Sequence, residues 1–161
     1  MKIITYEDKY KNQIIDLILY IQNVEYSVGL TIEDQPDLLN IGKYYLTNGG
    51  GFWIAVDDND KVIGTLGLQK RENNTGILKK FFVHKDYRGK VFGIATQLYN
   101  ELLTHAKKEG MNSIILDTPS VAARSHSFYK KAGFKEITRE QLPIKYEFPD
   151  RHSLLFILEL S

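Results

Sequence analysis

Cysteine is absent from this chain of 161 residues. Without it the chain cannot form disulfide bonds, thiolate zinc sites, iron–sulfur clusters or a cysteine nucleophile. A charge excess is missing too, because 21 Lys and Arg residues stand against 20 Asp and Glu residues, a net charge of +1. A general electrostatic attraction to nucleic acid or to an anionic membrane is therefore not expected.

Long hydrophobic runs are also missing. The apolar stretches, such as residues 14–21, are too short and too interrupted to cross a bilayer. Residues 1–12 contain neither a long apolar run nor a small-residue cleavage site, so they do not look like a secretory signal. We expect one soluble, cytoplasmic domain over residues 1–161, with neither nucleic acid nor membrane as a partner.

Hydrophobic spacing in the first half of the chain predicts a strand, two helices and a hairpin-rich sheet. Residues 2–6 are β-like, and apolar residues recur at helical spacing from Tyr10 to Ile21. Pro36 suits the first turn of a second helix, where its missing N–H costs nothing. Polar turns at 57–60 and 73–76 separate three strand-like segments, 52–56, 62–68 and 77–83. They predict an antiparallel meander.

The second half alternates helices and strands. Helices are predicted over residues 91–106, before Gly110, and over residues 122–132, before Gly133. Strands are predicted at 114–116, 134–137 and 153–160, the last almost continuously apolar, as is typical of a sheet interior. The polar segment 138–152 is a long loop of the kind that usually has a function. The fold class is therefore α+β: one domain with a mixed, mostly antiparallel sheet of about seven strands and about four helices.

The junction between the strand at 77–83 and the next helix gathers glycine and positive charge. The first N–H groups of a helix lack internal partners and lie at the positive end of its dipole, which favours a phosphate. Arg88 and Lys90 add charge there. A nucleotide-hydrolase P-loop is excluded because Gly89-Lys90 is followed by Val91, and a GxGxxG dinucleotide motif is absent. Taken alone, Gly89 and Gly93 are equally compatible with a tight turn.

Residues 88–95, RGKVFGIA, resemble the acetyl-CoA pyrophosphate loop of the GCN5-related N-acetyltransferases (the GNAT family), usually written Q/R-x-x-G-x-G/A. The preceding KKFFVHKDY, residues 79–87, is similar to the family's strand that enters this loop. Residues 122–134, AARSHSFYKKAGF, are similar to its A-x(n)-FYxKxGF segment. The order of elements fits over the whole chain. Val91 departs from the motif at its first glycine, which we expect to alter the loop backbone or the pocket near the pyrophosphate.

The resemblance implies an acyltransferase that moves an acetyl group from acetyl-CoA to the primary amine of a small molecule or peptide. Attack is direct, in a ternary complex, and no metal takes part. The pyrophosphate would lie on the N–H groups of residues 88–94, and the pantetheine arm would pair with the preceding strand. The residues expected to bind acetyl-CoA are Phe81, Phe82, Val83, Arg88, Gly89, Lys90, Val91, Phe92, Gly93, Ile94, Ala95, Ser120, Arg124 and Tyr129.

Tyr129 matches the family's general acid. A thiol has a pKa near about 8.5 and a phenol near about 10, so complete proton transfer to the departing thiolate is uphill by about 2 kcal/mol. A donated hydrogen bond suffices to stabilise that thiolate. The alternative is that Tyr129, one of ten tyrosines, is only a packed aromatic residue.

The residue that accepts the amine proton is less defined, because residues 76–80 lack the Glu found there in many relatives. The carboxylates considered are Glu25, Glu33, Glu72 and Asp117. Asp117, at the end of a strand, is the favoured base or positioning residue. A water relay or an amine of low pKa removes the need for a base. The acceptor pocket is expected to include Glu25, Glu33, Leu142 and Tyr146. Glu25, Glu33, Asp34 and Asp37 would form an acidic lip that attracts a cationic amine. An exposed, charged helix start explains these four residues equally well.

Other interpretations remain open. A catalytically silent acetyl-CoA sensor would keep the loop without turnover. A hydrolase using His126 would need an activated serine, and GxSxG is absent. The four histidines, His84, His105, His126 and His152, show no ligand spacing for a metal. The apolar last strand is a candidate surface for a homodimer.

Overall fold

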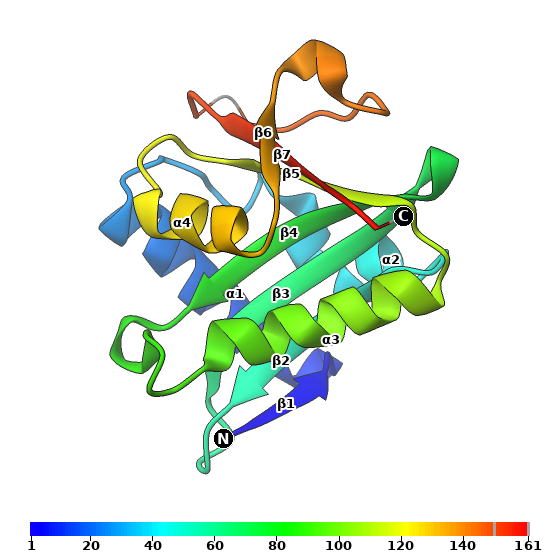
Figure 1. Cartoon of the computed structure of the whole chain (residues 1–161). Helices are drawn as coiled ribbons and strands as arrows, with labels where there is room; N and C mark the ends of the chain where they lie inside the picture. Colours follow the sequence, from blue (N-terminus) through cyan, green and yellow to red (C-terminus); the bar gives the residue numbers. More distant parts are fainter. Residues whose placement is uncertain (150, 161) are drawn as a thin grey trace.

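Within the residues that the structure describes, 1–149 and 151–160, a seven-stranded sheet forms the centre of this computed structural model (Figure 1). The strand order is β1-β2-β3-β4-β5-β7-β6, and neighbours are antiparallel except for β4 and β5. The strands are β1 (Lys2–Thr5), β2 (Gly51–Val56), β3 (Val62–Arg71), β4 (Thr75–Val83), β5 (Ser113–Thr118), β6 (Lys135–Ile137) and β7 (Leu154–Glu159). Parts of the predicted loop 138–152 and of the predicted domain 1–161 lie outside the described residues.

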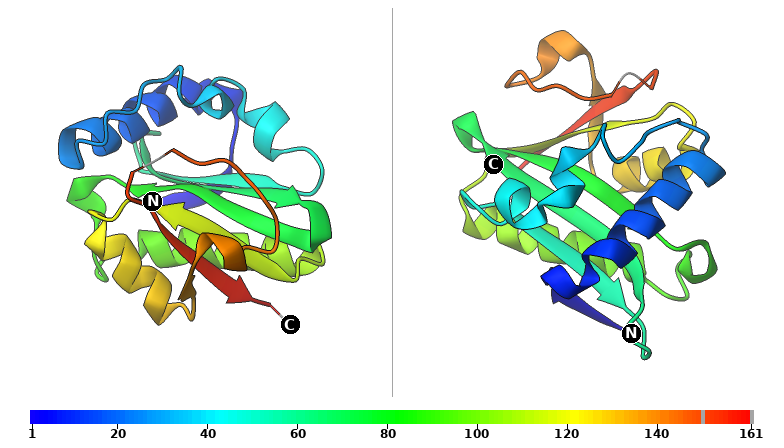
Figure 2. Two further views of the ribbon diagram at one scale, coloured as in Figure 1. Left: turned by 90° about the horizontal axis from the view of Figure 1, so that it is seen from above. Right: turned by 180° about the vertical axis from the view of Figure 1, so that it is seen from behind.

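Helices cover both faces of the sheet (Figure 2). On one face lie α1 (Lys11–Tyr20), which continues into a π-helical turn (Ile21–Glu25), and α2 (Ile41–Tyr45). On the other lie α3 (Ile94–Lys108) and α4 (Ala123–Lys131). Each helix turns an apolar stripe inward, because residues three or four apart share a face. Leu98, Leu102 and Ala106 of α3 are fully buried in this way. The α+β prediction is confirmed.

Two element boundaries differ from the prediction. Pro36 does begin a helical turn, but that turn is a short 3-10 segment (Pro36–Leu39), and α2 starts separately after Asn40, whose side chain accepts a hydrogen bond from Lys43 N–H. The helix predicted from residue 91 begins only at Ile94, since Gly93 is its N-cap with a left-handed φ of +64°. Val91 was therefore wrongly placed on the helix.

The last strand lies in the sheet interior, as its apolar sequence predicts. β7 pairs with β5 on one side and with β6 on the other. Its paired residues therefore offer no free edge to a second copy, and a homodimer stays a prediction.

The strands β4 and β5 separate soon after they meet. They pair only from Thr75 to Ile77 of β4, opposite Ser113 to Ile115 of β5. The later residues of β4 have no partner strand on this side, so a wedge opens in the middle of the sheet. The loop after β6 packs Ile144 and Tyr146 over Ile77 and covers the closed end of the wedge.

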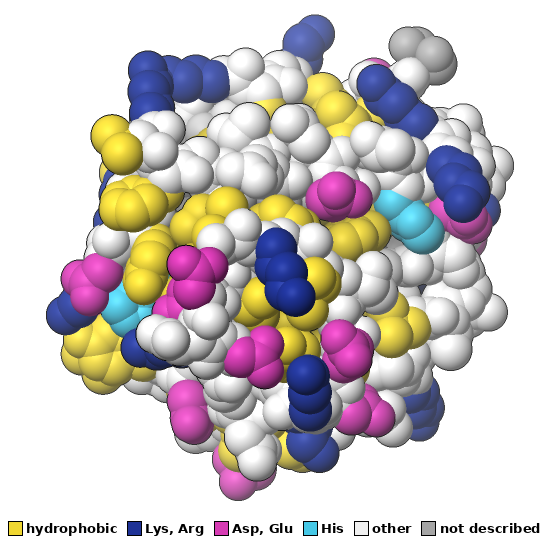
Figure 3. Space-filling view, turned by 90° about the horizontal axis from the view of Figure 1, so that it is seen from below, with side chains coloured by type: hydrophobic (Ala, Val, Ile, Leu, Met, Phe, Trp, Pro, Cys, Tyr) yellow, Lys and Arg dark blue, Asp and Glu magenta, His cyan; other side chains and the backbone are white. Residues whose placement is uncertain are grey.

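The outer surface is mixed in charge. Seen from below, acidic and basic side chains are interspersed around apolar ones (Figure 3). In the described part of the chain, no helix combines the length and the hydrophobicity needed to cross a bilayer.

Candidate active site

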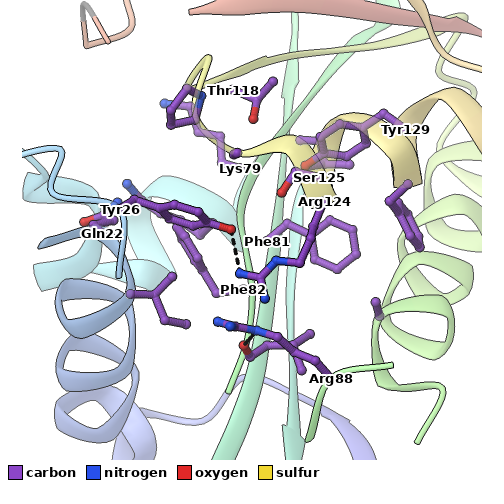
Figure 4. Close-up of a pocket in the computed structure, with 18 of the residues that line it drawn as sticks. Gln22, Tyr26, Lys79, Phe81, Phe82, Arg88, Thr118, Arg124, Ser125 and Tyr129 are labelled. Atoms are coloured by element: carbon purple, nitrogen blue, oxygen red, sulfur yellow. Dashed lines mark hydrogen bonds between the residues drawn. The ribbon is translucent and has the colours of Figure 1, made fainter. Parts of the chain in front are cut away.

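A cavity of about 360 Å³ fills the wedge between β4 and β5. Gln22 and Tyr26, from the π-helical turn, lie on one side of it, and Ser125 and Tyr129 of α4 lie on the other (Figure 4). Phe81 and the rest of the unpaired half of β4 line it between them. The unpaired backbone of a strand offers N–H and C=O groups to an extended ligand.

One end of the cavity is the loop that precedes α3. Gly89 has a φ of +104° and Gly93 a φ of +64°, conformations that favour glycine. The N–H groups of Phe92 and Gly93 donate to Gly89 O, which closes the turn. No side chain caps α3, so its first N–H groups remain available to an anion.

The residues of this loop do not all face the cavity. The cavity lining includes Arg88, Gly89, Lys90, Gly93 and Ala95. Val91, Phe92 and Ile94 are not part of that lining. Val91 is 94% exposed and does not have a positive φ. The side chain at this departure from the motif therefore forms no part of the cavity wall, and its effect on the loop stays a prediction.

Glu25 interacts with two arginines and is not an unpaired carboxylate in an acceptor pocket. Its carboxylate accepts two hydrogen bonds from the guanidinium of Arg88, at 2.6 and 3.1 Å, and lies 3.8 Å from Arg124 Nη2. Arg88 also donates from Nε to Val83 O at 2.9 Å. Arg124 donates to Tyr26 OH at 2.8 Å, a bond drawn in Figure 4. The charge of Glu25 is thus already compensated.

Tyr129 lines the cavity from α4. Its ring packs against Phe134 and Phe156, at centroid distances of 5.6 and 5.9 Å. Its hydroxyl lines the cavity and has no hydrogen-bond partner among the described residues. Burial, and then the nearby charge of Asp117, raise the pKa of Tyr129, so the phenol stays protonated at physiological pH.

Asp117 also lines the cavity, but both of its oxygens are engaged. Oδ2 forms an ion pair with Arg151 Nη2, and Oδ1 accepts a hydrogen bond from Tyr146 OH at 3.3 Å. Tyr146 is therefore not part of the cavity lining itself, but it contacts Asp117, which is. Burial, followed by the charge of Asp117, raises the pKa of Tyr146, which keeps it a donor.

Other predicted residues lie away from the cavity. Leu142 packs with the cluster of Ile77 and Ile115. Glu33 and Ser120 are exposed and do not line the cavity, and Glu72 pairs with its neighbour Arg71. His126 Nε2 lies 2.9 Å from Pro119 O. The described residues contain no group of three His, Asp or Glu side chains placed to hold a metal ion.

Two lysines of β4 were missed by the sequence analysis. Lys79 and Lys80 line the cavity, and Lys80 donates from Nζ to Gln35 Oε1 at 2.5 Å and lies 3.8 Å from Asp37 Oδ2. Burial lowers the pKa of Lys80 to about 8, although Asp37 opposes this shift. The signal for these residues was two consecutive lysines inside an otherwise apolar strand.

Both the sequence and the fold of this chain are similar to those of known acetyltransferases. The model described as "Acetyltransferase (GNAT) family" matches residues 15–134. A GNAT acetyltransferase from Staphylococcus aureus Mu50 is 35% identical, with a TM-score of 0.94 over 99% of both chains. An acetyltransferase from Streptococcus agalactiae 2603 is 38% identical, with a TM-score of 0.93 over 99% of this chain and 98% of that one.

A curated relative, the N-acetylaspartate synthetase of Xenopus tropicalis, is 35% identical over 105 residues. These residues are 64% of this chain and 38% of that protein. The chain spans about half the length, or less, of the first curated relatives it matches.

Proposed function

The chain belongs to the acetyltransferase (GNAT) family, and from that premise we propose that it transfers an acetyl group from acetyl-CoA to a primary amine. The observation that supports this most is the cavity itself. In one space it joins the unpaired edge of β4, the uncapped N-terminus of α3 and the hydroxyl of Tyr129. These are the three features that a thioester attached to a pyrophosphate requires.

In this proposal the pyrophosphate binds at the loop before α3. The first N–H groups of α3 and the ammonium of Lys90 face it, whereas Arg88 is already paired with Glu25. The pantetheine arm extends along β4 past Phe81, as an added strand. The main role of Arg88 is then structural, because its ion pair with Glu25 holds the loop against the π-helical turn that follows α1.

The proposed reaction needs a hydrogen-bond donor to the departing thiolate and an acceptor for the amine proton. The amine nitrogen bonds to the thioester carbonyl carbon, the C–S bond breaks, and the sulfur leaves as a thiolate that accepts a hydrogen bond from Tyr129. The amine proton passes to water, and the phenol recovers any proton it gives from water. Asp117 acts as a positioning residue, because Arg151 and Tyr146 occupy both of its oxygens.

The second candidate function is an acetyl-CoA sensor without turnover. It is favoured by one observation: Asp117 is the sole carboxylate lining the cavity among the described residues, and it is paired. The names of the curated relatives define no common acceptor. That of N-acetylaspartate synthetase specifies a product, and it does so for that protein.

Thermal unfolding with acetyl-CoA, ATP and NAD tests the first step. At one hundred times its dissociation constant, a ligand adds about 2.7 kcal/mol, or roughly 5–10 °C for a chain of this size. We expect this shift with acetyl-CoA and not with ATP or NAD. Equal shifts with all three ligands, or none, contradict the cofactor assignment. A shift with no thiol release from a broad amine panel supports the sensor instead.

A further inference from the structure

The end of the cavity that Lys79, Lys80 and Arg151 line, here called the acceptor end, has more positive than negative charge among the described residues. Lys79, Lys80 and Arg151 line it, and the carboxylates near them are Asp37 and Asp117. Of the expected acidic lip only Asp37 lies here, and it is paired with Lys80. Glu25 is paired with Arg88, and Glu33 and Asp34 are exposed. An additional cation would meet net repulsion at this end, and an anion would meet attraction.

A β-bulge brings the two lysines into the same cavity. Thr65 pairs with Phe82 and Gly67 with Lys79, so one residue of β3 lies opposite two residues of β4. Lys80 at this bulge has a φ of +58°, and its carbonyl accepts a hydrogen bond from Thr65 Oγ1 at 2.7 Å. Successive side chains of a regular strand point to opposite faces, and a bulge changes that alternation.

The partners of these cations differ. Lys80 is held by Gln35 and Asp37, and Asp37 also accepts a hydrogen bond from Tyr45 OH at 2.5 Å. Arg151 is paired with Asp117, yet its buried Nε has no hydrogen-bond partner.

The side chain of Lys79 has neither an ion pair nor a hydrogen bond to any other described residue. Figure 4 shows it among the side chains around the cavity. In the part of the chain that the structure describes, its ammonium is the cation at this end that has no partner.

We propose that the acceptor amine also bears a carboxylate, and that Lys79 binds this carboxylate beside Arg151. The inference rests on the proposed function, since it defines the acceptor class of the same site. Amino acids and compounds with a free carboxylate near the amine fit this charge distribution, whereas polyamines and other purely cationic amines do not. A carboxylate at Lys79 would pair with the cation of this end that has no partner among the described residues.

Matched pairs of amines test the acceptor class. Each pair is an amino acid and its α-carboxamide, assayed by release of the CoA thiol at saturating acetyl-CoA. We expect the carboxylate member to have a kcat/KM about tenfold or more above that of the amide, because a charge-assisted hydrogen bond is lost with the amide. Equal values, or a preference for the amide, overturn the inference.

Variants at Lys79 test the residue. Lys79→Met should bring the ratio of the two kcat/KM values close to one through the KM of the carboxylate member, and Lys79→Arg should keep most of it. Lys2→Met, which removes an exposed lysine of β1 far from the cavity lining, is the matched control. An unchanged ratio in Lys79→Met contradicts the assignment of Lys79.

Calorimetric binding separates this inference from the proposed function. N-acetylated amino acids and their amides are titrated into the protein saturated with CoA, so no turnover is needed. If the carboxylate product binds more tightly than its amide, and Lys79→Met weakens this binding, the inference is supported even when no amine is acetylated. In that case only the proposed acetyl transfer is contradicted. If amines are acetylated but the carboxylate product binds no better than its amide, the inference alone fails. Absence of binding by both products also counts against it.

Discussion

At the scale of single residues, Tyr129 is the side chain on which turnover depends in the proposed reaction. Its hydroxyl lies in the cavity without a hydrogen-bond partner among the described residues, and burial keeps it protonated. Removing one preorganised donor to a developing anion commonly costs about a hundredfold or more in kcat. A thiolate is a weaker acceptor than an alkoxide, so we expect Tyr129→Phe to lower kcat by about ten- to a hundredfold. KM for the acceptor should change little, as steady-state thiol release will show.

A matched substitution shows whether the loss of any buried tyrosine hydroxyl would have the same effect. Tyr99 on α3 is also buried, but its hydroxyl has no hydrogen-bond partner and does not line the cavity. Tyr99→Phe should leave kcat within about twofold and should not lower the unfolding free energy, because an unsatisfied buried hydroxyl is removed. If Tyr129→Phe behaves like Tyr99→Phe, Tyr129 is a packing residue and the assigned role is wrong.

At the scale of elements, the loop before α3 depends on the positions of its glycines. Gly89 and Gly93 have a positive φ, whereas Val91 does not. We therefore expect Val91→Gly to leave the Kd for acetyl-CoA within about twofold, although it restores the family motif. Its main effect should be a loss of roughly 0.5–1 kcal/mol in unfolding free energy, because glycine gives the unfolded chain more freedom. Calorimetry with acetyl-CoA and chemical denaturation measure the two quantities.

The comparison variant for this loop is Gly93→Ala. An alanine at a φ of +64° costs about 1–2 kcal/mol and displaces the start of α3, so the Kd for acetyl-CoA should rise several-fold. A gain in affinity from Val91→Gly would show that residue 91 limits binding after all. No loss of affinity from Gly93→Ala would show that the anion is bound elsewhere.

The elements were largely predictable from sequence, and the charge pairs between them were not. Hydrophobic spacing and turn residues are local signals, so the meander and the helix before Gly110 could be placed. The bulge at Lys80 depends on its register against β3, which no local pattern encodes. The pairing of Glu25 with Arg88 joins residues 63 positions apart, and that of Asp117 with Arg151 joins residues 34 apart. Such pairs exist only once the sheet has formed, so carboxylates that looked free in the sequence turn out to be compensated.

At the scale of the whole molecule, the acceptor end joins the 3-10 turn before α2, the bulge of β4 and the end of β5. Lys80 is packed among polar and charged groups from these three elements, from α2 and from the segment before β7. They are Asp37 with its donor Tyr45, Lys79, Asp117 and Arg151. Burial lowers the pKa of Lys80 to about 8, against an ordinary value of 10.5. Below pH 8 this lysine is therefore cationic, and above it the positive potential of the acceptor end decreases.

A pH titration of product binding tests this coupling. An N-acetylated amino acid has no amine to titrate, so its Kd reports the protein alone between pH 6.5 and 9.5. We expect Kd to be constant at low pH and to rise roughly three- to tenfold as the pH passes about 8, because one nearby cation is lost. Lys80→Arg should abolish the rise, since arginine stays charged over this range. Lys79→Met should bind more weakly throughout but keep the rise. A Kd that stays constant to pH 9.5 in the unmodified protein means that Lys80 keeps its proton, and Asp37 then outweighs the effect of burial.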